Sequence, residues 1–185
     1  MLKTIIQYPR DRDLHIQNVL LNIKDTIKLG ETEYLLLFNN KELARISLSS
    51  LTREIFITFS GSFNLAQYER IHNVILFISK EVDGTIDDSE SRLGYLENGE
   101  PAYIVNKWSQ WTELLNTAKY KTLEGQMVRV MDQTCNELGT GMLVEYKFST
   151  SLNQTSVITE CTLITLLGER HYVGETLYIE PTGQW

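Results

Sequence analysis

The longest run of regularly spaced apolar residues lies between positions 53 and 88 and predicts a strand followed by a helix. Residues 53–59 are mostly β-branched or aromatic, with apolar side chains on both alternating faces, which is typical of a buried central strand. Asn64 is a suitable N-cap for a helix whose apolar residues recur at helical spacing as far as Val82. Gly84 is expected to follow this helix at the C′ position. One face of the helix should therefore pack on a sheet.

The flanking segments predict the rest of an α+β sandwich. An apolar stripe from Ile16 to Ile27 predicts a helix that Asp13 caps and Gly30 closes. Four further strands are expected, at residues 4–8, 33–38, 43–48 and 84–87, with an Asn-Asn hairpin turn at positions 39 and 40. The resulting order, β-α-β-β-β-α-β, predicts an antiparallel or mixed sheet with two helices on one face.

The pattern changes in the second half of the chain. Residues 92–105 predict a hairpin with Asn98-Gly99 as its type I′ turn, and a short helix follows. From residue 126 onward the apolar period is two, and short strands alternate with Gly-containing turns. This pattern predicts a small antiparallel β-barrel, SH3-like in size and strand rhythm. We therefore divide the chain into an α+β domain with a linker helix, residues 1–123, and a β-barrel, residues 124–185.

The strand period also predicts which barrel residues face inward. The residues expected on the apolar faces of two strands are Met142, Val144, Tyr146 and Phe148, and Val157, Thr159, Cys161 and Leu163. Glu145 and Glu160 alternate out of these faces and are expected to reach solvent.

Composition restricts the class of protein. The chain has 185 residues, of which 42% are hydrophobic and 22% charged, as in an ordinary globular protein. Its first residues match neither a signal peptide nor a transmembrane helix, and its two cysteines are too few for a disulfide framework. We therefore expect a cytoplasmic protein, in which the glycosylation sequon at Asn153 has no role.

Charge distinguishes the barrel from the rest. The net charge of the chain is −7. Residues 124–185 contain three basic and eight acidic residues, a net charge of −5. Such a segment is unsuited to nucleic acid or to anionic membranes, because phosphate contacts require basic side chains. It suits a basic protein partner, for which Glu145 and Glu160 are the candidate contacts.

Each candidate for chemistry has a plain structural alternative. A two-residue turn at Leu167-Gly168 would place His171 opposite residue 164, so Cys161 and His171 would not form a nucleophilic pair. His72 borders the apolar face of its helix, as a core histidine with a hydrogen-bond partner does. The acidic residues between positions 83 and 90 lack the ligand spacing of an EF-hand, and Ser60-Gly61-Ser62 is explained by a turn before a helix cap. No catalytic residue, cofactor or metal site is predicted.

Trp108 and Trp111 share one face of the short helix between the two halves. They form either the contact between these halves or an exposed partner site, where tryptophan is enriched. The best hypothesis is a non-enzymatic cytoplasmic interaction module, an adaptor or an inhibitor of a basic protein, which contacts its partner through Trp108, Trp111, Glu145 and Glu160. The alternative is a small-molecule-binding protein or enzyme with its site in a cleft between the halves.

Overall fold

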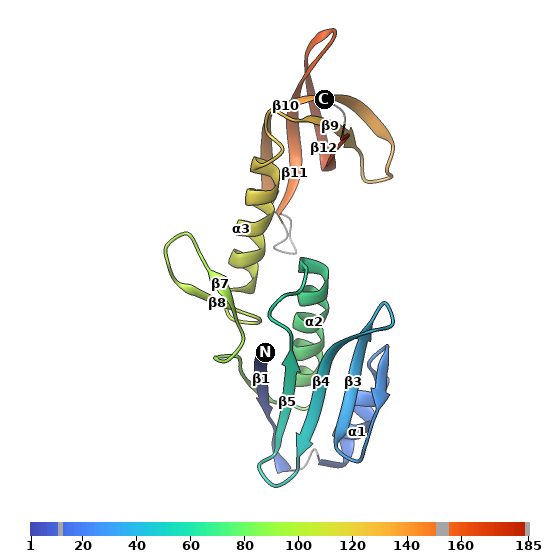
Figure 1. The fold of residues 1–185 in the computed structure, drawn as a ribbon, viewed down its shortest axis with the longest axis vertical. Coiled ribbons are helices and arrows are strands. Elements are labelled where there is room, and N and C mark those ends of the chain that lie inside the picture. Colours follow the sequence, from blue (N-terminus) through green and yellow to red (C-terminus); the bar gives the residue numbers. More distant parts are fainter. Residues whose placement is uncertain (11–12, 151–155, 184–185) are drawn as a thin grey trace. The chain divides into compact units, whose positions relative to one another are not determined.

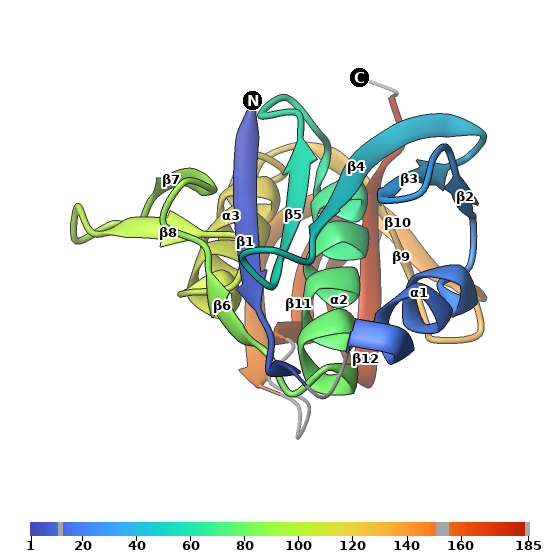
Figure 2. The same ribbon diagram turned by 90° about the horizontal axis from the view of Figure 1, so that it is seen from below.

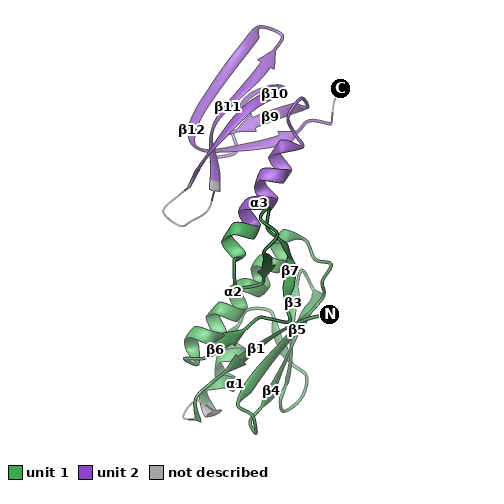
Figure 3. Cartoon of the chain, turned by 90° about the vertical axis from the view of Figure 1, so that its left-hand side faces the viewer, with its two compact units in different colours: residues 1–111 green, residues 112–185 purple. Residues whose placement is uncertain are grey.

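The computed structural model describes residues 1–10, 13–150 and 156–183, and the sequon at Asn153 lies outside them. The chain divides into two compact units, residues 1–111 (unit 1) and 112–185 (unit 2), coloured separately in Figure 3. The division falls within helix α3, Trp108–Lys121. The proposed domain limits, 1–123 and 124–185, concern the parts that fold independently and stay a prediction. None of the helices in the described part of the chain is both long and apolar enough to span a membrane.

Unit 1 is built on a six-stranded sheet. Its strands are β1 (Leu2–Gln7), β2 (Thr26–Lys28), β3 (Glu33–Phe38), β4 (Lys41–Ser49), β5 (Glu54–Phe59) and β6 (Thr85–Asp87). They lie in the order β2-β3-β4-β5-β1-β6, and every neighbouring pair is antiparallel. Helices α1 (Asp13–Asn22) and α2 (Leu65–Glu81) cover the same face of the sheet (Figures 1 and 2). The predicted α+β sandwich is confirmed.

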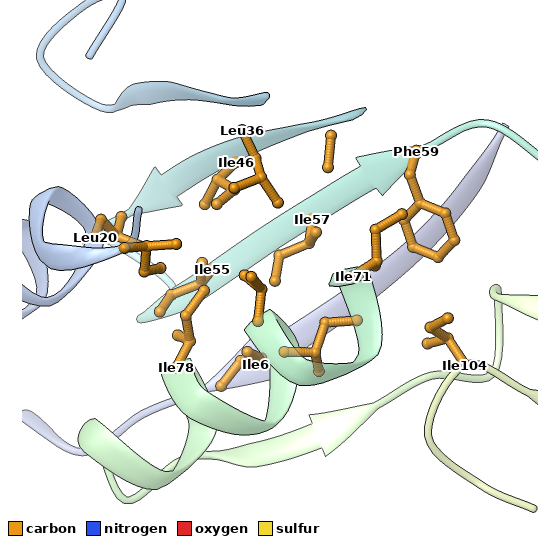
Figure 4. Packing of buried hydrophobic residues seen from close by; sticks show 14 of the residues in the cluster. Ile6, Leu20, Leu36, Ile46, Ile55, Ile57, Phe59, Ile71, Ile78 and Ile104 are labelled. Atoms are coloured by element: carbon orange, nitrogen blue, oxygen red, sulfur yellow. The ribbon is translucent and has the colours of Figure 1, made fainter. Parts of the chain in front are cut away.

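The core of unit 1 lies between β5 and α2. Ile55, Ile57 and Phe59 point from β5 toward Ile71 and Ile78 of α2, and all are buried (Figure 4). The strand was predicted to be buried on both faces. Only the helix-facing residues are fully buried, whereas the alternate residues of β5 are half-buried on the sheet face that carries no helix. One covered face is the usual arrangement in an antiparallel sheet.

The two ends of α2 confirm one prediction and correct another. Asn64 caps α2 reciprocally with Gln67: its side-chain oxygen accepts from the Gln67 N–H at 2.9 Å, and its own N–H donates to Gln67 Oε1 at 3.0 Å. After α2, however, Asp83 takes the left-handed conformation, with a φ of 50°, and Gly84 does not. Gly84 is required instead because a Cβ there would lie 2.6 Å from Cγ2 of Ile6.

Helix α1 is shorter than its apolar stripe predicted. It ends at Asn22, and Ile27 lies in β2, an additional edge strand that the pattern did not reveal. The Asp13 side chain, predicted as the cap, lies outside the described side chains. The hairpin of β7 (Arg92–Tyr95) and β8 (Pro101–Tyr103) is confirmed, but its predicted type I′ turn is wrong: Gly99 has a positive φ, of 80°, whereas Asn98 does not, and a type I′ turn needs a positive φ at both residues.

Unit 2 contains a closed antiparallel barrel. Its strands are β9 (Met127–Met131), β10 (Glu137–Thr150), β11 (Ser156–Thr165) and β12 (Gly168–Pro181). They close in the order β10-β11-β12-β9, so the predicted small barrel is confirmed. Tyr172 packs against the barrel core and its ring lies against Gly139, where an added Cβ would overlap the tyrosine hydroxyl. The other interior residues are Val128, Val130, Leu143, Ile158, Cys161, Leu163, Leu177 and Ile179.

Two irregularities in pairing correct the predicted apolar faces of the barrel. The β10–β11 register shifts between Leu143 and Glu145. Leu143 therefore points inward before the shift, whereas Tyr146 and Phe148 point toward the core after it, and Met142 and Val144 are exposed. The β10–β11 register shifts again between Lys147 and Phe148, which pair with Glu160 and Ile158, so that Ile158 and Cys161 are both buried. A single extra residue on one strand changes the side to which all later side chains point.

Candidate interaction surface

The outward-facing side chains of the barrel form three rows that cross its strands. The upper row contains Met127, Met142, Ile164 and Glu169; the middle row contains Glu145, Thr162 and His171, of which Thr162 is buried by its neighbours; the lower row contains Lys147, Glu160 and Val173. Directly opposed residues on antiparallel strands have Cβ atoms about 4.5–5.5 Å apart, so the members of each row are neighbours. We call these three rows the outer surface of the barrel. Glu145 and Glu160, which the sequence singled out, lie in adjacent rows of it.

The two glutamates differ in their electrostatic surroundings. Lys147 Nζ donates to Glu160 Oε2 at 2.8 Å, and His171 Nε2 lies 3.8 Å from the same oxygen. The hydrogen bond from Lys147 holds the pKa of Glu160 below its usual value, and Glu160 in turn raises the pKa of Lys147. Glu145 is exposed and forms no ion pair with any residue that the structure describes. The negative charge of Glu145 is therefore more available to a partner than that of Glu160.

The upper row is mainly apolar. Met127, Met142 and Ile164 are 38–40% exposed, and Val144, at the register shift, is 49% exposed. The turn that follows β11 adds Leu166 and Leu167, which are 105% and 83% exposed. We call these residues the apolar strip: Met127, Met142, Val144, Ile164, Leu166 and Leu167.

Sequence reasoning missed the apolar strip, although the sequence contains a signal for it. Met142-Leu143-Val144 and Leu163-Ile164 are consecutive apolar residues within strands. Successive side chains on a strand point to opposite faces, so such a run exposes at least one of its members when only one face is buried. Leu163 and Leu143 point into the barrel, and their neighbours therefore point out.

The two tryptophans belong to unit 1, whereas Glu145 and Glu160 belong to unit 2. Trp111 is 8% exposed and meets the Tyr68 ring edge to face, with the ring centres 5.8 Å apart. Trp108 is half-buried and stacks on His72 at 4.5 Å, with an angle of 12° between the ring planes. Both tryptophans are thus held by the core of unit 1. Their predicted role in a contact between the halves stays a prediction.

The cysteine and histidine of the barrel do not form a nucleophilic pair. The turn consists of Leu166 and Leu167, so His171 lies opposite Thr162 and not opposite residue 164 as predicted. The Thr162 hydroxyl and His171 Nδ1 are 3.1 Å apart on the outer surface. Cys161 points into the barrel, and burial raises the pKa of its thiol to about 11. A thiol with that pKa remains protonated near neutrality and is a poor nucleophile.

The remaining candidate groups have structural partners. His72 Nδ1 lies 2.7 Å from the carbonyl oxygen of Ile104, and burial lowers the pKa of this histidine. Asp88, which is 3% exposed, uses both carboxylate oxygens on the backbone and side chain of residues 105 and 106. Across the described residues, no three His, Cys, Asp or Glu side chains are arranged to hold a metal ion. The acidic residues between positions 83 and 90 are therefore not gathered into one site.

No family model matches the chain, and no curated protein matches it. Two solved structures of the biotin protein ligase from Aquifex aeolicus are similar in part: one, in complex with biotin and ATP, has a TM-score of 0.25 and 10% identity, and the apo structure has a TM-score of 0.24 and 12% identity. They cover 97% and 94% of this chain and 77% and 74% of the ligase chains. At these scores the likeness supports no argument about function.

Proposed function

We propose that this chain is a non-enzymatic cytoplasmic interaction module, an adaptor or an inhibitor, that binds a basic protein through the outer surface of its barrel. The observation that supports this is the state of the charges on the barrel. Two of the three basic side chains in residues 124–185 are already paired, Arg129 with Glu180 at 3.2 Å and Lys147 with Glu160 at 2.8 Å. Glu145 and Glu169 remain exposed, and neither has an ion pair within the described chain.

Unpaired exposed carboxylates attract a basic partner at a distance. Complementary charge mainly accelerates association, and the acceleration weakens as salt shortens the Debye length from about 10 Å at 0.1 M to about 3 Å at 1 M. The module should therefore associate with its partner faster at low salt. An adaptor and an inhibitor are distinguished by whether the bound partner stays active.

The test uses the full chain as bait in an extract of the native host, followed by association kinetics with the purified partner. Replacing both Glu145 and Glu160 by Lys should slow association, and the effect should diminish in about 1 M salt. The matched control replaces Glu31 and Glu97, two exposed glutamates of unit 1, by Lys, which changes the net charge equally. The proposal fails if both double variants associate at the same rate, or if the ligand proves to be a small molecule.

A further inference from the structure

We infer that the apolar strip is the docking site for an amphipathic helix of the partner, with large apolar side chains on one face and Lys or Arg beside them. This inference rests on the proposed function and specifies the chemistry of the partner. Exposed apolar residues that gather on one surface, bordered by polar ones, mark interaction sites. The six side chains of the strip are contiguous: three form one row across β9, β10 and β11, and the others lie at the bulge and at the adjacent turn.

The mode of binding follows from the closure of the barrel. At the upper row the strands are paired on both sides, because Met142 pairs with Met127 and Ile164, and Ile164 also pairs with Glu169, so a partner strand has no free edge to join there. The partner must therefore bind through side chains. Neighbouring strands are about 4.8 Å apart, which is the spacing of Met127, Met142 and Ile164 in the upper row. Residues three or four apart on a helix are about 5–6 Å apart, so an apolar helix face matches this row.

The charge of the partner follows from the borders of the strip. Glu169 lies directly opposite Ile164 in the upper row, and Glu145 follows Val144 on the same strand. Arg170, by contrast, lies opposite Leu163, whose side chain points inward, and so it projects from the other face of β12. The strip is thus bordered by two carboxylates. Lys or Arg beside the apolar face of the helix would pair with them and set the orientation of the helix.

The inference is tested with a synthetic probe and the full chain. The probe is a fluorescein-labelled peptide of about 18 residues with Leu at helical spacing on one face and Lys on the others. The control peptide has the same composition with the Leu residues dispersed around the helix. Fluorescence anisotropy should show that the amphipathic peptide binds at least about tenfold more tightly, a difference of about 1.4 kcal/mol.

Variants of the chain locate the site. Replacing Leu166 and Leu167 by Ser, or Ile164 by Thr, should weaken binding of the amphipathic peptide about tenfold and abolish its advantage over the control peptide, because each change removes apolar surface from the contact. The Ile164 variant retains a β-branched residue and so preserves the strand. Leu51→Ser is the matched control: Leu51 is 94% exposed but belongs to unit 1, and its replacement should leave binding unchanged.

The outcomes separate this inference from the proposed function. Equal binding of both peptides, weakened equally by the Glu145 and Glu160 reversals, would overturn the apolar site and leave an acidic binding surface. Failure of both peptides to bind would also overturn it, while association with the native partner would still decide the proposed function. A dimer in light scattering that the Leu166 and Leu167 variant dissociates would identify a second copy of this chain as the occupant and overturn the inference.

Discussion

Removing the Asp88 carboxylate should destabilise unit 1 far more than removing that of its neighbour Asp87. Asp88 follows β6 and fixes the connection that leads into α3: its Oδ2 accepts from the N–H groups of Val105 at 2.9 Å and Asn106 at 2.7 Å, and its Oδ1 accepts from Asn106 Nδ2 at 2.6 Å. Asp87 is exposed and accepts only from Ser89, at 3.0 Å from the N–H. The pair offers a large and a small perturbation at adjacent positions.

The magnitude follows from the donors that each change leaves without an acceptor. Asp88→Ala leaves two backbone N–H groups without an acceptor, and each one that stays buried lowers the free energy of unfolding by about 1–3 kcal/mol. Asn106 is exposed and can be rehydrated, so we expect a loss of about 2–4 kcal/mol. Asp88→Asn keeps one oxygen that accepts from both N–H groups, and the Asn106 side chain, if flipped, can accept from the new amide. The free energy of unfolding should therefore fall by only about 1 kcal/mol. Asp87→Ala should cost about 0.5 kcal/mol or less.

Urea unfolding followed by tryptophan fluorescence suits this comparison, because two of the three tryptophans, Trp108 and Trp111, pack in unit 1. The midpoints should fall in the order wild type, Asp87→Ala, Asp88→Asn and Asp88→Ala. Equal midpoints for the two alanine variants would refute the assignment of these hydrogen bonds. Equal midpoints for Asp88→Asn and Asp88→Ala would show that the charge, and not the acceptor geometry, supplies the stability.

Three further predictions concern the packing of the barrel, the two tryptophans and the domain limit. Gly139→Ala should destabilise the barrel by about 1–3 kcal/mol in thermal unfolding, because the new Cβ would overlap the Tyr172 hydroxyl and lie 2.8 Å from its Cζ; an unchanged midpoint would contradict this. Replacing Trp108 and Trp111 by Ala should lower the free energy of unfolding by several kcal/mol, because truncating a fully buried aromatic ring costs about 3–5 kcal/mol. Loss of a partner with unchanged stability would instead identify the pair as a binding site. A fragment that starts at residue 124 should give a β-rich circular dichroism spectrum, and a random-coil spectrum would refute the proposed domain limit. A fragment that starts at residue 112 should unfold at a higher temperature than the shorter one.

The higher stability expected of the fragment that starts at residue 112 has a structural reason. Tyr120 of α3 packs against Tyr146 and Phe148, with ring centres 5.9 and 5.7 Å apart, and Leu123 is buried in the core of unit 2. A fragment that begins at residue 124 lacks both side chains. The predicted limit at 123/124 was placed where the apolar period changes, but period reports local structure and does not show which unit a helix packs against.

Local chemistry made much of unit 1 predictable. The cap at Asn64 and the position of the hairpin turn at Asn98-Gly99 depend on a few neighbouring residues, and both are confirmed, although the turn is not of type I′. The reason for a glycine at position 84 was predicted wrongly. Glycine is required there because a Cβ would overlap Ile6, which is remote in sequence. The edge strand β2 was missed because its three residues are too few to show a period. The failed predictions depended either on which segments meet in space, as for Gly84, or on segments too short to show a period, as for β2.

The barrel shows why the candidate surface was harder to predict than the fold. An uninterrupted period of two over β10 would place either Leu143 or the pair Tyr146 and Phe148 inside, but not all three. The register shift after Leu143 allows all three to contribute to the core of unit 2. It does so by leaving Val144 in solvent beside Glu145. The same irregularity that completes the core therefore exposes part of the apolar strip next to an unpaired carboxylate, and a change that restored regular pairing would alter the core and the surface together.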